Sequence, residues 1–221
     1  MTTGIVIAIL LLLLIGNCIL KKAGSVKFRQ FAGKAHKVVG IVFIAAAVVH
    51  LILTLPLFKQ RPIAMYILGI AMLVFAIIEF ALFLLRKKWQ KGWLKAHRIC
   101  AVLMLCCLIG HIFFGLTSLV AYQKNVAAIK VKDVDLSKVK DGTYEGICDV
   151  QYVYAKVKVK VENHKIVSVD LLEHRTERGQ KAEVLPEHIV KEQKVTVDTV
   201  SGATNSSRVI EQAVCNALTG R

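Results

Sequence analysis

Residues 93–122 read WLKAHRICAVLMLCCLIGHIFFGLTSLVAY, an apolar run that carries two histidines, His97 and His111. These histidines are 14 residues apart, which on an α-helix is close to four turns, so both lie on nearly the same face, about 21 Å apart along the axis. His36 and His50, in an earlier apolar run, are also 14 residues apart. The repeated spacing indicates a shared role for the four histidines.

Four apolar runs are long enough, or nearly long enough, to span a bilayer as helices. They are Gly4 to Leu20, about His36 to Phe58, Pro62 to Leu85, and about Ala96 to Tyr122. The residues after Tyr122 have the composition of an ordinary soluble domain. We therefore predict a membrane protein with an all-α four-helix transmembrane bundle over residues 1–122, a linker over 123–140 and a small α+β domain over 141–221.

The net charge of +15 is concentrated in the apolar part of the chain. Residues 1–122 contain 14 Lys and Arg but one acid, Glu79, whereas the remainder contains 16 Lys and Arg and 14 acids. This distribution argues against a nucleic-acid-binding surface on the soluble part. The loops between successive runs carry six, two and six basic residues, so the positive-inside rule places the first and third loops in the cytoplasm. The N-terminus, on a retained helix rather than a cleaved signal peptide, and the C-terminal domain are then outside the cytoplasm.

An acid within an apolar helix is costly in hydrocarbon, which makes Glu79 a functional candidate. Contact with a quinone or a proton is one interpretation, and a salt bridge to a basic residue such as Arg86, about two turns away, is the other. The six cysteines form no CxxC or CxxCH motif, which argues against a zinc site and against c-type haem attachment. The sequence leaves open whether Cys148 and Cys215 pair in the exported domain.

The second and fourth helices run in the same direction through the predicted bundle, so their equal spacing brings the histidines to two common levels. His36 is then level with His97 near the cytoplasmic face, and His50 with His111 nearer the outer face. Two axial imidazoles at each level are what a low-spin b-type haem requires, and metal-free polar packing is the alternative. The residue four positions after each histidine is small, which leaves room for a flat macrocycle or simply lets helices approach. These residues are Gly40, Thr54, Ala101 and Gly115.

In helix number and histidine placement, residues 1–122 resemble the four-helix, dihaem b-type membrane cytochromes. The resemblance implies two haem b groups, stacked across the bilayer, that pass electrons between the cytoplasmic and outer sides. It implies His36 and His97 as ligands of the cytoplasmic-side haem, and His50 and His111 as ligands of the outer-side haem.

The C-terminal domain opens with DGTYEG at residues 141–146. Residues 156–161 alternate strictly between Lys and Val, a polar turn follows through Asn163 and His164, and residues 166–171 alternate again. This pattern predicts a β-hairpin with one apolar face. Residues 181–193 are predicted to form a helix interrupted or started at Pro186, and residues 206–218 a final amphipathic helix.

The most specific local pattern is DTVSGATNSS, residues 198–207, directly before the final helix. Gly202 and Ala203 permit close backbone approach. The helix start offers unpaired N–H groups and the positive end of the helix dipole, so a phosphate on Thr204 would be well placed. An ordinary Ser/Thr helix cap is the other interpretation.

The order of residues in this motif resembles the flavinylation motif of the FMN-binding domain family. That family includes the C subunit of the sodium-pumping NADH:quinone reductase and the G subunit of the Rnf complex. The resemblance implies that Thr204 forms a phosphoester with FMN, installed outside the cytoplasm by a flavin transferase that uses FAD. Ser201, Gly202 and Ala203 are then the turn around the attachment residue, and Asp198 belongs to the signature that the transferase reads.

The resemblance covers about residues 141–218, including DGTYEG, the hairpin and the segment around His174. Arg175 and Arg178 make that segment more basic than the family pattern, which affects the expected contacts with the flavin ring. His174 is either a flavin contact or a solvated residue at a strand end, and His164 and His188 are expected at the surface.

Together these patterns predict a multi-pass protein of the cell membrane that transfers electrons through two haem b groups to a covalent extracytosolic FMN. The donor is in the membrane or on its cytoplasmic side, such as a quinol or a redox partner protein, and the acceptor is external. Two alternatives stay open. The FMN domain is a terminal reductase in its own right, for example of ferric iron, or the helices carry no haem and anchor a flavoprotein complex.

Overall fold

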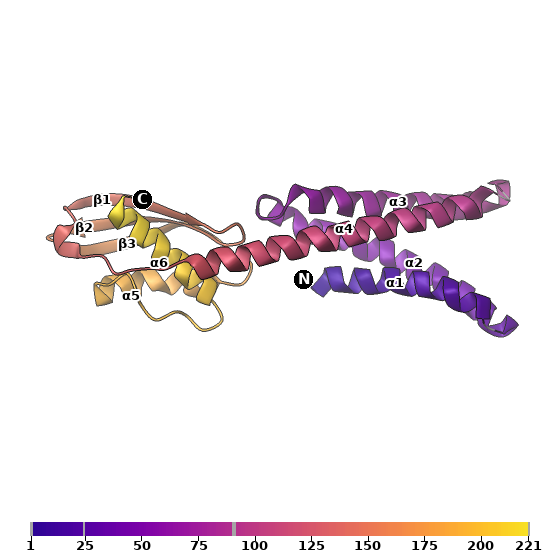
Figure 1. Cartoon of the computed structure of the whole chain (residues 1–221), viewed down its shortest axis with the longest axis horizontal. Coiled ribbons are helices and arrows are strands. Elements are labelled where there is room, and N and C mark those ends of the chain that lie inside the picture. Colours follow the sequence, from indigo (N-terminus) through magenta and orange to yellow (C-terminus); the bar gives the residue numbers. More distant parts are fainter. Residues whose placement is uncertain (1, 24, 90–91, 221) are drawn as a thin grey trace. The chain divides into compact units, whose positions relative to one another are not determined.

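The computed structural model describes residues 2–23, 25–89 and 92–220. The chain divides into two compact units, Met1–Thr117 and Ser118–Arg221. In the described residues, the first unit is helical, and the second combines a three-stranded sheet with helices (Figure 1).

All four apolar runs fold as helices. By length and composition, three helical segments of the described chain are able to cross a membrane, namely Val26–Gln60, Ile63–Trp89 and Gly92–Ala128, and the apolar part of the first helix, Thr3–Asn17, is shorter. The elements are α1 Thr2–Ala23, α2 Val26–Thr54 with the 3-10 helix η1 Leu55–Gln60, α3 Ile63–Trp89, and α4 Gly92–Ala128. These helices are compatible with a membrane protein.

A small apolar cluster joins the four helices of the first unit. Phe43 of α2 and Met104 of α4 are both nearly inaccessible, at 3% and 2% exposure. Each lies seven residues from both histidines of its own helix, or roughly 10 Å along the axis by the helical rise. This apolar cluster therefore lies midway between the two histidines of α2 and midway between the two histidines of α4. Its buried members are Leu11, Phe43, Ala76, Met104 and Leu108.

Helix α4 extends beyond the predicted end of the fourth apolar run. It continues past Tyr122 to Ala128, so the first residues of the segment expected as a linker are helical. Tyr122 and Val126 are buried in the core of the second unit. Burial of one face of the helix in this core, a contact that local composition does not reveal, accounts for the extension.

The second unit contains an antiparallel sheet with strand order β1-β2-β3. Its strands are β1 Gly142–Asp149, β2 Tyr154–Glu162 and β3 Lys165–Arg175. The Lys/Val alternation places Val157, Val159 and Val161 in the core at 0% exposure, which confirms the predicted hairpin. Its two turn residues, Asn163 and His164, both have positive φ, the geometry of a tight two-residue hairpin turn.

The first residue of DGTYEG holds that turn. The carboxylate of Asp141 accepts hydrogen bonds from the backbone N–H groups of Asn163 at 2.8 Å and His164 at 3.1 Å. These bonds lower the pKa of Asp141 below its ordinary value, because they favour the charged carboxylate. The motif therefore ties the start of β1 to the β2–β3 turn.

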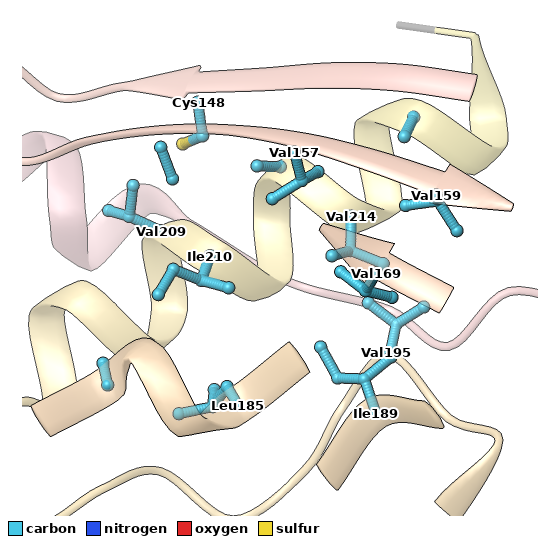
Figure 2. Packing of buried hydrophobic residues seen from close by; sticks show 14 of the residues in the cluster. Cys148, Val157, Val159, Val169, Leu185, Ile189, Val195, Val209, Ile210 and Val214 are labelled. Atoms are coloured by element: carbon cyan, nitrogen blue, oxygen red, sulfur yellow. The ribbon is translucent and has the colours of Figure 1, made fainter. Parts of the chain in front are cut away.

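The sheet is covered by the helices that follow it, namely the 3-10 helix η3 Gln180–Val184, α5 Leu185–Glu192 and α6 Thr204–Thr219. Figure 2 shows Val209, Ile210 and Val214 of α6 packed among Val157 and other residues of the core. The predicted apolar stripe of the final helix is buried throughout, and the helix ends at Gly220, which has φ 69°. Pro186 lies in the first turn of α5, where proline is favoured.

Gly146 allows α6 to lie directly against β1. A Cβ atom at this position would collide with the backbone of Ala213 and Ala217. We expect Gly146→Ala to lower the free energy of unfolding of the second unit by about 1–3 kcal/mol, because backbone cannot yield as a side chain does. Thermal unfolding of the full-length protein measures this loss. Gly142→Ala in the same strand is the control, since its Cβ would meet only the Tyr144 side chain, at 3.5 Å, and an equal loss there would contradict the explanation.

Candidate functional site

The S-G-A turn lies immediately before α6. Gly202 has φ 78°, and Thr204 is the first residue of the helix. The backbone N–H of Ala203 donates to the carbonyl of Val200 at 2.9 Å. Ser201, Gly202 and Thr204 are exposed, whereas Ala203 is buried. The turn thus presents Thr204 to solvent on a backbone held by the bond from Ala203 to Val200.

Ser207 fixes this turn from within the core. Its hydroxyl donates to the Ala203 carbonyl at 3.1 Å and accepts from the Val200 N–H at 3.1 Å, and its side chain is fully buried. The residue at the N-cap position is Ala203, with no side-chain cap. Since alanine has no acceptor, the Ser/Thr cap expected as an alternative is not formed by the N-cap residue, and the first N–H groups of α6 remain available to an anion.

His174 lies behind the first turn of α6. Its Nε2 is 3.1 Å from the Ser206 hydroxyl, its Nδ1 is 2.9 Å from the Glu183 carboxylate, and its side chain is 3% exposed. The ring therefore links β3, η3 and α6 and is not a solvated strand-end residue. Ser206 is also 3.2 Å from the Thr176 hydroxyl. Glu183 and Ser206 had no distinguishing pattern in the sequence, because their roles come from packing against His174.

The two arginines of this segment have different environments. Arg175 lies over the Tyr154 ring at 4.1 Å and its Nε is 3.0 Å from Glu173, so its charge is engaged on the sheet. Arg178 is exposed, as are Asp198, His164 and His188. The exposure of the last two histidines agrees with the prediction.

Asn205, which follows Thr204, is held by the end of α4. Its Nδ2 donates to the Tyr122 hydroxyl at 2.9 Å. The Tyr122 and Tyr152 rings are 5.0 Å apart, and the Tyr152 hydroxyl is 2.7 Å from the Ser118 hydroxyl. Both tyrosines are buried. This buried pair supports the turn of the motif, and sequence reasoning missed it because the partners are far apart along the chain.

The two cysteines of the second unit do not pair. Cys148 and Cys215 are both free thiols. Burial raises the pKa of the Cys148 thiol to about 11, so this thiol is protonated at neutral pH.

In the first unit, the structure brings His36 and His97 together. Their ring centroids are 6.0 Å apart, with an angle of 76° between the ring planes. Glu79 Oε2 is 3.5 Å from His97 Nδ1. Arg86, the partner considered for Glu79, instead donates from Nη1 to the Phe83 carbonyl at 2.7 Å. The carboxylate of Glu79 therefore faces a histidine rather than that arginine.

His50 and His111 are each held by a hydrogen bond to another helix. The Nδ1 of His50 is 2.9 Å from the Thr3 hydroxyl, and the Nδ1 of His111 is 2.9 Å from the Met65 carbonyl. The glycines beside these rings are Gly4 and Gly69. They come from other helices, whereas Gly40 has open space around its Cβ position and Gly115 meets Met65.

The spacing of His36 and His97 fits the needs of a haem iron. A metal–imidazole bond is about 2 Å long, so two imidazoles on opposite sides of one iron have ring centroids about 6 Å apart, close to the 6.0 Å of His36 and His97. The Met65 carbonyl accepts only, so His111 carries its proton on Nδ1 and its lone pair on Nε2. The described residues contain no group of three or more His, Cys, Asp or Glu side chains that could hold a bare metal ion. A porphyrin iron takes only two ligands from the protein.

Comparison with protein families matches residues 153–219 to the FMN-binding domain. The matched segment runs from β2 to α6 and includes Thr204 and the turn before it. The match supports the FMN-binding part of the resemblance, and an FMN-binding domain indicates a role in flavin-based electron transfer. Comparison with curated proteins gave no match, and neither did comparison with solved structures.

Proposed function

We propose that the protein transfers electrons across the cell membrane to an FMN held covalently by Thr204 outside the cytoplasm, and from there to an external acceptor. A quinol in the membrane, or a redox partner on the cytoplasmic side, is the donor. The observation that carries the proposal is the contact between His36 and His97 in a chain whose second unit matches the FMN-binding domain.

The second unit supplies the flavin site. Thr204 is exposed for attachment, Gly202 and Ala203 form the turn, and Ser207 holds that turn to the helix. The uncapped first N–H groups of α6 are suited to the phosphate of FMN. Attachment through the phosphate leaves the flavin ring free for redox chemistry, and Asp198 is exposed where a flavin transferase would read the motif.

The first unit supplies two haem positions. His36 and His97 would hold the haem b on the cytoplasmic side, and His50 and His111 the haem b on the outer side. Bound haem supplies reversible one-electron redox chemistry. Thr3 and Met65 orient the outer-side rings, Glu79 faces His97, and the apolar cluster with Phe43 and Met104 lies midway between the histidines of α2 and of α4.

The charge distribution supports the orientation. Basic residues are concentrated in the first and third loops, which the positive-inside rule assigns to the cytoplasm. The domain with Thr204 is then extracytosolic, where a flavin transferase modifies this motif in the family that it resembles.

The exposure of Thr204 and its turn favours a second candidate function. A flavin attached there is accessible to small acceptors, so the FMN domain itself is able to act as a terminal reductase, for example of ferric iron. Steady-state turnover with ferric chelates and small organic acceptors separates such an enzyme from a relay that requires a protein acceptor.

A cofactor count on the purified full-length protein tests the main proposal. Pyridine haemochrome analysis is expected to give two haem b per chain, and mass spectrometry of the C-terminal peptide one FMN on Thr204. Flavin without haem would instead support a membrane anchor for a flavoprotein, and haem without flavin would contradict the role of Thr204.

A further inference from the structure

Glu79 lies beside one of the proposed haem ligands, His97, and residues 1–122 contain no other acid. Its Oε2 is 3.5 Å from His97 Nδ1, and the two side chains are 20% and 21% exposed. Its Oε1 is buried, with no hydrogen-bond partner among the described residues. A carboxylate in an apolar bundle is costly, and this one is directed at a single histidine nitrogen.

Two other histidines, His50 and His111, have a defined partner at Nδ1, and both partners are neutral groups. His50 meets the hydroxyl of Thr3, and His111 meets the carbonyl of Met65. Only at His97, among these three, does the ring nitrogen face a carboxyl group. The two proposed haem positions therefore differ in the chemical groups behind their ligands, and only the position formed by His36 and His97 has an ionisable one.

We propose that Glu79 is a positioning residue for His97, and that its charge selectively lowers the reduction potential of the haem position formed by His36 and His97. This inference rests on the proposed function. A carboxylate beside Nδ1 favours a positive ring and so makes Nε2 a more basic ligand. A more basic ligand, with a negative charge nearby in a medium of low dielectric constant, stabilises ferric over ferrous iron.

The functional consequence is directional. Lowering the potential at the cytoplasmic-side position makes it a better electron donor to the outer-side position, which favours outward flow toward Thr204. Lys37 and Arg98, adjacent in sequence to His36 and His97, act in the opposite sense. These two basic residues are unchanged when only Glu79 is replaced. The difference in reduction potential between the variant and the wild type therefore isolates the effect of the carboxylate.

Glu79→Gln in the full-length protein is the test, since glutamine keeps an acceptor oxygen and removes the charge. Redox titration of the haem absorption bands is expected to show two retained haems, one of them with its potential raised. A tenfold change in the ferric-to-ferrous ratio at a fixed potential corresponds to 59 mV for one electron, and we expect a rise of at least this size. The other potential is expected to remain at its wild-type value.

Two further variants assign the shift. Glu79→Gln in a His111→Ala background leaves only the cytoplasmic-side haem, which must show the same rise. Glu79→Asp keeps the charge and is expected to restore a potential closer to that of the wild type.

Every other outcome contradicts either the role of Glu79 or the proposed function on which that role rests. Two retained haems with unchanged potentials in Glu79→Gln overturn the inference and leave the proposed function intact, as does a shift confined to the outer-side haem. If the Glu79→Gln protein loses one haem, the inference requires that the Glu79→Asp protein keeps that haem at a potential near the wild-type value. Loss of the haem from Glu79→Asp as well would show that Glu79 has a packing role without a charge effect, and would overturn the inference. Absence of haem from the wild-type protein refutes the proposed function itself.

Discussion

Thr204→Ala is expected to abolish covalent flavin completely while both haem spectra stay unchanged. The reason is chemical, because alanine has no hydroxyl to form the phosphoester. The residue is exposed at the start of α6, and within the described part of the chain the turn is held by the hydroxyl of Ser207 rather than by that of Thr204. The measurement is in-gel flavin fluorescence of the denatured protein together with the mass of the C-terminal peptide.

Thr219→Ala at the opposite end of α6 is the matched control. Thr219 is also an exposed threonine, and its hydroxyl donates to the Cys215 carbonyl, so its loss tests whether a change in the helix alone affects flavin content. We expect full flavinylation in this variant. Persistent flavin fluorescence of the denatured Thr204→Ala protein would rule out Thr204 as the attachment residue. Loss of haem from the same variant would show that the flavin site and the haem sites are not independent.

His111→Ala is expected to remove one haem of two and to leave the covalent flavin in place. Its imidazole is a proposed haem ligand, and the alanine side chain has no atom that can bind iron. His36 and His97, the proposed ligands of the other haem, remain in contact. Pyridine haemochrome analysis should fall from two haems per chain to one, and the flavin mass on the C-terminal peptide should not change.

The control for this variant is His188→Ala. His188 is exposed on α5 of the second unit, and its removal is expected to preserve both haems. His36→Ala should also remove one haem, but the haem that remains should differ in reduction potential from the one left in His111→Ala. An unchanged haem count in His111→Ala would refute its assignment as a ligand.

The sequence was most informative where a structure is built from neighbouring residues. The Lys/Val alternation of residues 156–161 predicted the hairpin, because side chains alternate between the faces of a strand. The final helix, predicted over residues 206–218 and observed over Thr204–Thr219, followed from its apolar stripe and from Gly220 after it. Prediction was weaker at helix ends such as that of α4, where packing of Tyr122 and Val126 in the second unit lengthens the helix.

For the candidate site, the motif at residues 198–207 identified Thr204, but it did not reveal the groups that support the turn. Tyr122 bonds Asn205 across 83 residues of chain, and His174 bonds Ser206 across 32. Likewise the spacing of the histidines suggested two levels but gave no neighbour for their Nδ1 atoms, which the structure provides for three of the four in Thr3, Met65 and Glu79.

The sequence by itself determined the apolar helices, the hairpin, the amphipathic final helix and the position of the DTVSGATNSS motif, since each depends on residue periodicity or on consecutive residues. Only the tertiary structure decided that Glu79 faces His97 rather than Arg86, and that His174 is buried against Ser206 and Glu183. Such pairs depend on how each helix is rotated about its axis and where it crosses its neighbours. That choice is made by packing over the whole unit, and periodicity along one helix does not encode it.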